Sequence, residues 1–325
     1  MRDFEYRRAA DPEQASKLAG AAEARLIAGG TLLVDLLRLE VERPALVVDI
    51  NELDWKSVEE DARGVRIGAL VKNSELAYHP MIQRRYRVLS EALLSGASAQ
   101  IRNMASVGGN LLQRTRCSYF RDIGVSACNK RTPGSGCAAL EGYSRMHAVL
   151  GGSDHCIAVN PSDMNVALVA LDARIEVQGP KGPREIAVAD LHTLPGEHSE
   201  IETVLEPGEL ISHVRLPASE RRSAYVKVRD RASYAFALAS AGVALELDGS
   251  AIKSARVALG GVATKPWRAQ EIEQALVGQA PNRQSFESAA ARGFDEAHTT
   301  SHNAFKVKLA QRTIVLALAR AMETA

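Results

Sequence analysis

All four cysteines of this 325-residue chain fall within one stretch of forty residues. They are Cys117, Cys128, Cys137 and Cys156, with ten, eight and eighteen residues between successive members. Independent placement would give such clustering on the order of one time in a hundred, so the spacing needs a physical reason. The stretch also contains Pro133-Gly134-Ser135-Gly136 and few long apolar runs. This pattern predicts irregular backbone held together by something other than regular secondary structure.

Several chemistries could use these thiols. Four thiolates suffice for a [4Fe–4S] cluster, and wide spacing is compatible with a loop that wraps the cluster. Zinc is a second candidate, although no C-x-x-C pair is present. Two disulfides or four free thiols are the third. Residues 101–147 carry seven Arg or Lys against two acidic residues, a net charge of +5 that would stabilise an anionic cluster. His147 or His155 could replace one cysteine ligand. The simpler interpretation is that these histidines lie beside the ligands or have no role at the site.

Length and composition describe an ordinary globular protein. Hydrophobic residues make up 46% of the chain and charged residues 24%, and the net charge is +1. These values fit two or three domains with buried cores, and exclude a disordered chain or a globally basic surface. Aromatic residues, at 5%, do not alternate with the basic segment as they do in single-strand-binding proteins. No apolar run approaches the roughly 18 residues that span a bilayer. We therefore expect no nucleic acid and no membrane as partners.

Apolar periodicity predicts alternating helices and strands, then a C-terminal third with strands first and helices after. The expected N-terminal elements are a helix starting at Asp11-Pro12, a strand over 25–28, a helix to Leu39 capped by Thr31, and a strand over 45–50. A strand over 65–70, a helix over 82–94, and strands over 173–178, 184–188 and 210–216 follow. After a polar segment over 217–222, strands over 224–228, 237–247 and 254–259 precede helices over 268–277, 284–292 and 303–322.

Two Gly-Gly turns suit an anionic ligand. The first, Ile27-Ala28-Gly29-Gly30-Thr31, joins a strand to a helix N-terminus, where backbone N–H groups can approach phosphate oxygens. The second, Ser106-Val107-Gly108-Gly109-Asn110, adds hydroxyl and amide groups. Each alone is better explained as a plain turn, because neither has the G-x-G-x-x-G pattern or a Walker lysine. As a pair they predict a diphosphate held from two sides.

Two later charged residues are candidates for the same ligand. Asp163 follows Ser162 at the expected start of a helix, where its simplest role is that of N-cap. A carboxylate there could also accept hydrogen bonds from ribityl or ribose hydroxyls. Lys227, on a later strand, could reach a flavin carbonyl or phosphate, although an isolated lysine is more often a surface residue. No nucleophile–base motif is present, so we expect no catalytic side chain in this chain.

Taken in order, these segments resemble the FAD-binding segments of molybdenum hydroxylase flavoproteins, the medium subunits of the xanthine dehydrogenase and carbon monoxide dehydrogenase family. The resemblance lies in residues 27–31, 101–111, 162–163 and 225–229. In most members, Ser-Asp follows the Gly-Gly-Asn turn within a few residues, whereas here about fifty residues intervene and carry every cysteine. That insertion resembles the FAD subunit of periplasmic-type aldehyde oxidoreductases, which holds a [4Fe–4S] cluster. The flavin subunit of 4-hydroxybenzoyl-CoA reductase is also similar, but its cysteine spacing differs.

The resemblance implies an α+β fold and two cofactors, FAD and a [4Fe–4S] cluster. A two-part FAD-binding domain of the vanillyl-alcohol-oxidase/PCMH type would cover residues 1–218, with subdomains at about 1–52 and 53–218 and the cysteine-rich insertion at 112–160. A C-terminal α+β domain would cover 219–325. The first turn would wrap the pyrophosphate with backbone amides, and the second turn would contact the adenine-diphosphate half or the ring edge. Asp163 would bind flavin or ribityl hydroxyls, and Lys227 would lie near the flavin ring. The implied FAD contacts are Leu26, Ile27, Ala28, Gly29, Gly30, Thr31, Leu32, Leu33, Val34, Ser106, Gly109, Asn110, Thr115, Asp163, Ile211 and Lys227. The implied metal ligands are Cys117, Cys128, Cys137 and Cys156.

The implied function is electron transfer within a heterotrimer. A molybdenum-cofactor large subunit would oxidise aldehydes to carboxylic acids, and electrons would pass through a [2Fe–2S] small subunit to FAD and then to an external acceptor. Three alternatives stay open: the flavin subunit of a 4-hydroxybenzoyl-CoA-reductase-like or xanthine-dehydrogenase-like complex, a stand-alone FAD oxidase, and a zinc-stapled, non-enzymatic binding protein. The first six residues lack an apolar signal region. We therefore expect either a cytoplasmic protein or periplasmic export with a signal-bearing partner.

Overall fold

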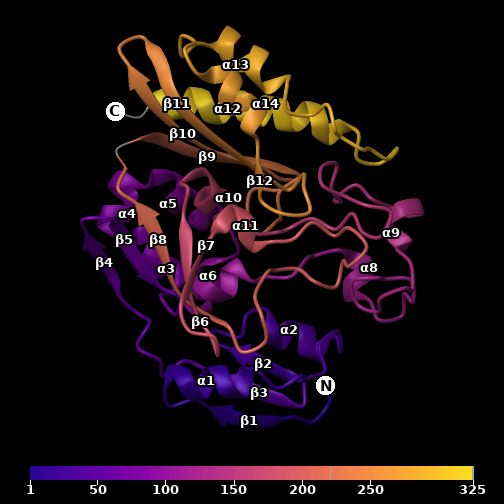
Figure 1. Ribbon diagram of the computed structural model, residues 1–325. Helices are drawn as coiled ribbons and strands as arrows, with labels where there is room; N and C mark the ends of the chain where they lie inside the picture. The colour runs from indigo at the N-terminus through magenta and orange to yellow at the C-terminus, as the bar shows by residue number, and fades with distance from the viewer. Residues whose placement is uncertain (220, 324–325) are drawn as a thin grey trace.

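Three sheets with their helices follow one another from one end of the molecule to the other (Figure 1). The computed structural model describes residues 1–219 and 221–323. The N-terminal sheet lies at one end, the C-terminal helices lie at the other, and the cysteine segment projects from one side of the middle (Figure 1). Among the described residues, no helix has the length and apolar character needed to cross a bilayer.

The first sheet is parallel, with strand order β1-β3-β2. Its elements are β1 (Glu5–Arg8), α1 (Pro12–Ala19), β2 (Ala24–Ile27), α2 (Leu33–Arg38) and β3 (Leu46–Asp49). The predicted start of α1 is confirmed, because the Asp11 carboxylate accepts a hydrogen bond from the Gln14 backbone N–H at 2.7 Å. The sequence did not predict β1, since all four of its residues are exposed and carry no apolar alternation.

The second sheet is antiparallel throughout, with order β4-β5-β8-β6-β7. The strands are β4 (Val58–Asp61), β5 (Gly64–Gly68), β6 (Arg174–Gln178), β7 (Arg184–Ala187) and β8 (Leu210–Pro217). Its helices are α3 (Asn73–Tyr78), α4 (Pro80–Arg85), α5 (Arg87–Ser95), α6 (Ala99–Met104), α7 (Val107–Leu111), α10 (Asp163–Ala170) and α11 (Val188–Leu191). The prediction of one helix over 82–94 is wrong. The helix breaks at Tyr86, whose hydroxyl donates to the Pro217 carbonyl at 2.9 Å.

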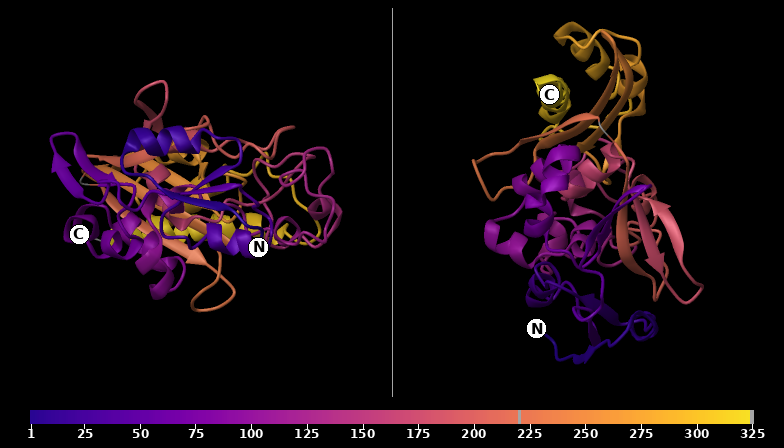
Figure 2. Two further views of the ribbon diagram at one scale, coloured as in Figure 1. Left: turned by 90° about the horizontal axis from the view of Figure 1, so that it is seen from below. Right: turned by 90° about the vertical axis from the view of Figure 1, so that its left-hand side faces the viewer.

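The third sheet is antiparallel, with order β12-β11-β10-β9. Its elements are β9 (Arg222–Val228), β10 (Ala239–Asp248), β11 (Ala251–Gly260), β12 (Trp267–Arg268), α12 (Gln270–Leu276), α13 (Arg283–Ala290) and α14 (Phe305–Glu323). This order of strands followed by helices is the one predicted for the C-terminal third. The three helices cover one face of the sheet (Figure 2).

The opposite face of the third sheet packs on α10, a helix whose eight residues are all buried. The sequence of α10, Asp-Met-Asn-Val-Ala-Leu-Val-Ala, is largely apolar on every side of the helix. Such a helix belongs in a protein interior. The close approach requires Gly260, because a Cβ there would lie 2.5 Å from Val166 Cγ2. Helix α10 thus joins the second and third parts of the molecule, and its first residue is Asp163.

The cysteine segment has little regular structure, as predicted. It holds only two single-turn helices, α8 (Ser118–Arg121) and α9 (Ala138–Glu141), and a one-residue antiparallel bridge between Cys128 and Cys137. Arg131 braces the loop by donating hydrogen bonds to the carbonyls of Tyr119 at 2.9 Å and Phe120 at 2.8 Å. The backbone carbonyls of this irregular loop are thereby partly satisfied by a side chain.

Candidate functional site

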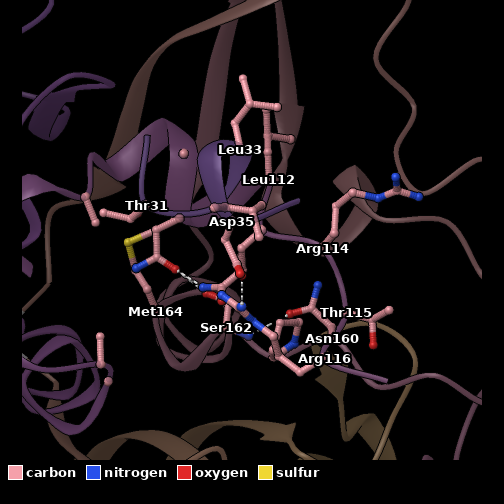
Figure 3. Close-up of a pocket in the computed structure, with 18 of the residues that line it drawn as sticks. Thr31, Leu33, Asp35, Leu112, Arg114, Thr115, Arg116, Asn160, Ser162 and Met164 are labelled. Carbon is pink, nitrogen blue, oxygen red and sulfur yellow. Dashed lines mark hydrogen bonds and ion pairs between the residues drawn. The ribbon is translucent and has the colours of Figure 1, made fainter. Parts of the chain in front are cut away.

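A cavity of about 1330 Å³ lies where the first two sheets meet the cysteine segment and the start of α10 (Figure 3). Its walls come from residues 24–36, 101–118, 159–164 and 205–211, with a loop over 230–237 at its rim. Small-molecule sites typically measure about 300–1,000 Å³. The cavity is therefore large enough for a dinucleotide.

The two predicted glycine turns lie against each other at one side of this cavity. A Cβ on Gly29 would fall 1.9 Å from the backbone oxygen of Met104, so only glycine allows the first turn to approach the second. Gly30 has a φ of +71°, which glycine adopts without strain. Thr31 does not cap α2 as predicted. The N-cap is Leu32, which makes no side-chain hydrogen bond, and of the first-turn amides the Val34 N–H donates to the Gly30 carbonyl at 3.1 Å.

The second turn forms the first turn of helix α7. Ser106 is its N-cap, and Ser106 Oγ accepts from the Gly109 N–H at 3.3 Å. Asn110 Oδ1 accepts from Ser162 Oγ at 2.8 Å, which ties this turn to the start of α10. Segments more than fifty residues apart in sequence therefore meet at the cavity.

Asp163 is held by two side chains from β9. Lys227 Nζ lies 2.8 Å from Asp163 Oδ2, and the Tyr225 hydroxyl donates to Asp163 Oδ1 at 2.5 Å. The expectation that Asp163 caps α10 is wrong, because Ser162 Oγ accepts from the Asn165 N–H at 3.1 Å and does so instead. That leaves the carboxylate free to pair. Lys227, with 3% of its side chain exposed, is not a surface lysine.

Tyr225 is a site residue that sequence reasoning missed. It lies two positions before Lys227 on β9, and residues i and i+2 share one face of a strand. The two-residue spacing from Lys227 was therefore the signal in the sequence that could have identified Tyr225. Complete burial and the neighbouring Asp163 carboxylate raise the pKa of Tyr225 well above its usual value. The phenol therefore remains protonated and donates to Asp163.

Nearly all the predicted FAD contacts line this one cavity. The residues that do so are Leu26, Ile27, Ala28, Gly29, Gly30, Thr31, Leu32, Leu33, Ser106, Gly109, Asn110, Thr115, Asp163, Ile211 and Lys227. Val34 does not, because it lies on the outer face of α2 with 42% of its surface exposed. Residues that were not predicted also face the cavity, among them Asp35 and Arg116, which form an ion pair at 3.0 Å (Figure 3).

All four cysteines line a second, small cavity beside the first. None forms a disulfide, so the two-disulfide alternative is wrong. Burial raises the pKa of the Cys117 thiol to about 12, so without a metal this thiol is protonated. Among residues 1–219 and 221–323, no three His, Cys, Asp or Glu side chains are grouped so that they could hold a metal ion. Cys117 lines both cavities and separates them.

Comparisons with known proteins agree with this geometry. Residues 2–219 match the family described as FAD binding domain in molybdopterin dehydrogenase, and residues 223–321 match CO dehydrogenase flavoprotein C-terminal domain. The chain is 50% identical over 325 residues, covering 99% of both proteins, to the aldehyde oxidoreductase FAD-binding subunit PaoB of Escherichia coli. The chain belongs to the FAD-binding subunits of the molybdenum hydroxylase family.

More distant relatives of this FAD-binding subunit share the fold. The glyceraldehyde dehydrogenase medium chain of Sulfolobus acidocaldarius is 28% identical over 283 residues, which cover 86% of this chain and 83% of the relative. The solved carbon monoxide dehydrogenase from Hydrogenophaga pseudoflava has a TM-score of 0.77 at 24% identity, covering 99% of this chain and 98% of the other. The predicted α+β fold and family are thus confirmed. The alternative of a non-enzymatic, zinc-stapled binding protein is wrong.

The basic residues of the FAD-binding subunit do not present a net +5 to the cysteines, contrary to expectation. Four arginines of segment 101–147 pair with acidic residues outside it. The pairs are Arg114 with Glu42 and Glu202, Arg116 and Arg121 with Asp35, and Arg145 with Asp230. Counting charge along one segment fails here because the fold brings the opposite charges from elsewhere. Lys130 lines the cysteine cavity, but it too is paired, with Glu202 at 3.0 Å.

A lysine of the C-terminal helix reaches the cysteine segment of the FAD-binding subunit. Lys306 on α14 is 0% exposed, and its Nζ donates to the His147 carbonyl at 2.8 Å and the Gly261 carbonyl at 2.5 Å. Burial lowers the pKa of Lys306 to about 7 and the pKa of His147 to about 4. Lys306 was missed by sequence reasoning. Its spacing of four and eight residues from buried Ala310 and Ile314 places it on the inner face of α14.

Buried His192 should make the stability of the FAD-binding subunit fall below neutral pH. Its Nε2–H donates to the Leu111 carbonyl at 3.0 Å, and burial lowers its pKa from 6.5 to about 4. Between these pH values His192 binds a proton in the unfolded chain but not in the folded chain. Its contribution to the free energy of unfolding is therefore fully present above pH 6.5 and decreases by about 3 kcal/mol toward pH 4. We expect His192→Gln to flatten the pH dependence of urea unfolding over that window. His198→Gln, at an exposed site, is the control, and an unchanged profile for His192→Gln would contradict the assignment.

Proposed function

We propose that this chain is the FAD- and [4Fe–4S]-containing electron-transfer subunit of a heterotrimeric molybdenum hydroxylase that oxidises aldehydes to carboxylic acids. The observation that carries the proposal is the pair of adjacent cavities. One gathers both glycine turns, Asp163 and Lys227, and the other is lined by all four cysteines. The aldehyde as substrate class is inferred from the 50% identity to an aldehyde oxidoreductase subunit over the full chain.

The large cavity offers separate places for the parts of FAD, a cofactor that accepts and releases one or two electrons. Residues 26–33 would bind the pyrophosphate through backbone N–H groups, with the α2 N-terminus favouring its negative charge. Ser106, Gly109, Asn110 and Thr115 would contact the adenine-diphosphate half or the adjacent ring edge. Asp163 would accept from ribityl or flavin donors while Lys227 and Tyr225 hold its carboxylate in place. Ile211 would supply an apolar contact.

The substrate chemistry belongs to another subunit in this proposal. Oxidation of an aldehyde with water to a carboxylic acid releases two electrons and two protons, and the sequence shows no nucleophile–base motif that would serve it. A molybdenum-cofactor subunit would carry out that step. A [2Fe–2S] subunit would then deliver the electrons to FAD in this chain, from which an external acceptor takes them. The described part of this chain accordingly needs to bind, orient and shield a cofactor rather than to activate a substrate.

The four cysteines are proposed as the ligands of the [4Fe–4S] cluster. Their donor chemistry fits, because four unpaired thiols face one cavity and no disulfide competes for them. The wide spacing of the four cysteines, with no C-x-x-C pair, suits a cluster wrapped by a loop better than a single zinc ion.

We also propose a division into an FAD-binding domain over 1–218 and a C-terminal domain over 219–325. Separate hydrophobic clusters support it. The cluster around the C-terminal sheet contains α12, α13 and α14 side chains and few residues from the rest of the chain, chiefly Val149 and Leu150. The proposed subdivision at about residue 52 is crossed by the smaller cluster around the first sheet, which Leu53, Trp55, Leu70 and Leu210 also join.

Anaerobic purification of the chain with its neighbouring subunits tests the proposed function. We expect about one FAD and about four iron atoms bound by this chain, in addition to the iron of the small subunit, together with molybdenum and aldehyde-oxidising activity. A preparation without flavin absorbance would refute the proposal. Gel filtration showing a monomer that oxidises aldehydes by itself would favour a stand-alone oxidase. Activity on purines and none on aldehydes would favour the xanthine-dehydrogenase-like alternative.

A further inference from the structure

The wall between the two cavities contains Cys117 and His147 side by side. Both line the large cavity, but only Cys117 also lines the cysteine cavity. The imidazole Nε2 of His147 lies 3.1 Å from Cys117 Sγ. His147 is buried, and within residues 1–219 and 221–323 its Nδ1 has no hydrogen-bond partner. The function proposed above gives this imidazole no role.

We propose that His147 is a positioning residue that donates a hydrogen bond from Nε2–H to the sulfur of Cys117 and so tunes the cluster that Cys117 helps to hold. The inference rests on the proposed [4Fe–4S] site. A thiolate bound to iron carries no hydrogen, so the imidazole has to be the donor in this pair. A hydrogen bond to a ligand sulfur disperses negative charge. It therefore stabilises the reduced cluster, the more negative form, and raises the reduction potential.

The position of the imidazole is fixed by contacts on its backbone. Lys306 Nζ donates to the His147 carbonyl at 2.8 Å, and the His147 N–H donates to the Ser144 carbonyl at 2.9 Å. The next residue is held as well, because Asn303 Nδ2 donates to the Ala148 carbonyl at 3.2 Å. With the peptide units on both sides anchored, the imidazole is directed to Cys117 before any cofactor binds. A donor that needs no rearrangement gives the stronger effect.

His147 is placed beside the ligand set and not within it. The four cysteines and His155 line the cysteine cavity, and His147 does not. Its ring packs near Tyr119, with centroids 6.0 Å apart, and Tyr119 itself lines the cysteine cavity. A ligand would have to face the metal directly, whereas a hydrogen-bond donor has only to reach the ligand sulfur.

Two substitutions in the intact complex test the inference. His147→Leu removes the donor, and His147→Gln keeps an N–H group on a flexible side chain. The readouts are iron per FAD, the cluster midpoint potential from a reductive titration followed by electron paramagnetic resonance, and the rate of iron loss to a chelator. We expect full iron in both variants, a more negative midpoint potential in His147→Leu, and about tenfold faster iron loss in that variant. His147→Gln should resemble the wild type.

The outcomes separate this inference from the proposed function. An unchanged potential and unchanged chelation rate in His147→Leu would overturn the hydrogen bond. Loss of iron from both variants would make His147 a ligand and overturn its role as a positioning residue. Wild-type complex without four iron atoms in this chain would refute the cluster itself. Flavin content and the melting temperature of each variant show whether the subunit has folded.

Discussion

Replacing Cys128 with serine should reduce the iron bound by this chain from about four atoms to less than one. The serine hydroxyl is a harder donor and is not ionised near neutral pH, so it does not replace a thiolate in an iron–sulfur cluster. Cys128 is buried on the cysteine cavity, where solvent offers no substitute ligand. FAD should remain at about one per chain, because Cys128 does not line the large cavity. Metal analysis and the visible absorption spectrum measure both.

Ser126→Ala is the matched control for this variant, since Ser126 lies two residues away on the same loop and is exposed. Cys128→Ala distinguishes ligand loss from any effect of the serine hydroxyl against the apolar neighbours Leu36 and Phe120. Both cysteine variants should lose iron and the control should keep it. Four iron atoms per chain in Cys128→Ser would exclude this residue as a ligand.

Lys227→Met should destabilise the subunit by about 3–5 kcal/mol and lower its flavin content. Removing one partner of a buried pair leaves the other as an uncompensated buried charge. Asp163 has 8% of its side chain exposed, and Lys227 and the Tyr225 phenol are its side-chain partners. Because the same carboxylate lines the large cavity, its protonation or displacement would also weaken flavin binding. Urea unfolding followed by circular dichroism and flavin fluorescence measures both effects.

Lys181→Met makes the same chemical change at an exposed pair with Glu206, where about 0–1 kcal/mol is expected. A loss of stability in Lys227→Met no greater than that in Lys181→Met would show that the buried ion pair stabilises the subunit no more than the exposed pair does. Tyr225→Phe tests the third member of the group. It removes only a neutral hydrogen bond to a carboxylate, so its effect should be smaller, about 1.5–3 kcal/mol.

Sequence patterns predicted what depends on neighbouring residues. The Asp11 cap, strands β6 and β7 and the strands-then-helices order of the C-terminal third could be predicted, because each depends on local spacing or turn chemistry. The two glycine turns, which lie far apart in the sequence, were paired because both suit one diphosphate. The choice between Ser162 and Asp163 as the cap of α10 could not be predicted from the sequence. Both residues can cap a helix, and the distant Lys227 and Tyr225 decide which of them does.

Long-range partners explain the other differences. Tyr86 interrupts an apolar helical pattern, and its hydroxyl bonds to Pro217, more than a hundred residues away. Of the surplus of five positive charges in segment 101–147, four are offset by Asp35, Glu42, Glu202 and Asp230. Strand β1 exists through parallel pairing with β3 and not through a pattern of its own. None of these partners can be chosen from local periodicity, since tertiary contacts override local preference.

The support of the cysteine segment by the end of the chain has a consequence for biosynthesis. The carbonyls of residues 147, 148 and 149 receive their hydrogen bonds from Lys306, Asn303 and the backbone N–H of His298. A nascent chain lacks all three donors until residues 298–306 have been made. We therefore expect the insertion that carries Cys117 to reach its final shape only after those residues are in place, and the proposed cluster to be loaded after that. Truncation before residue 298, although it spares every cysteine, should yield a subunit that cannot be loaded.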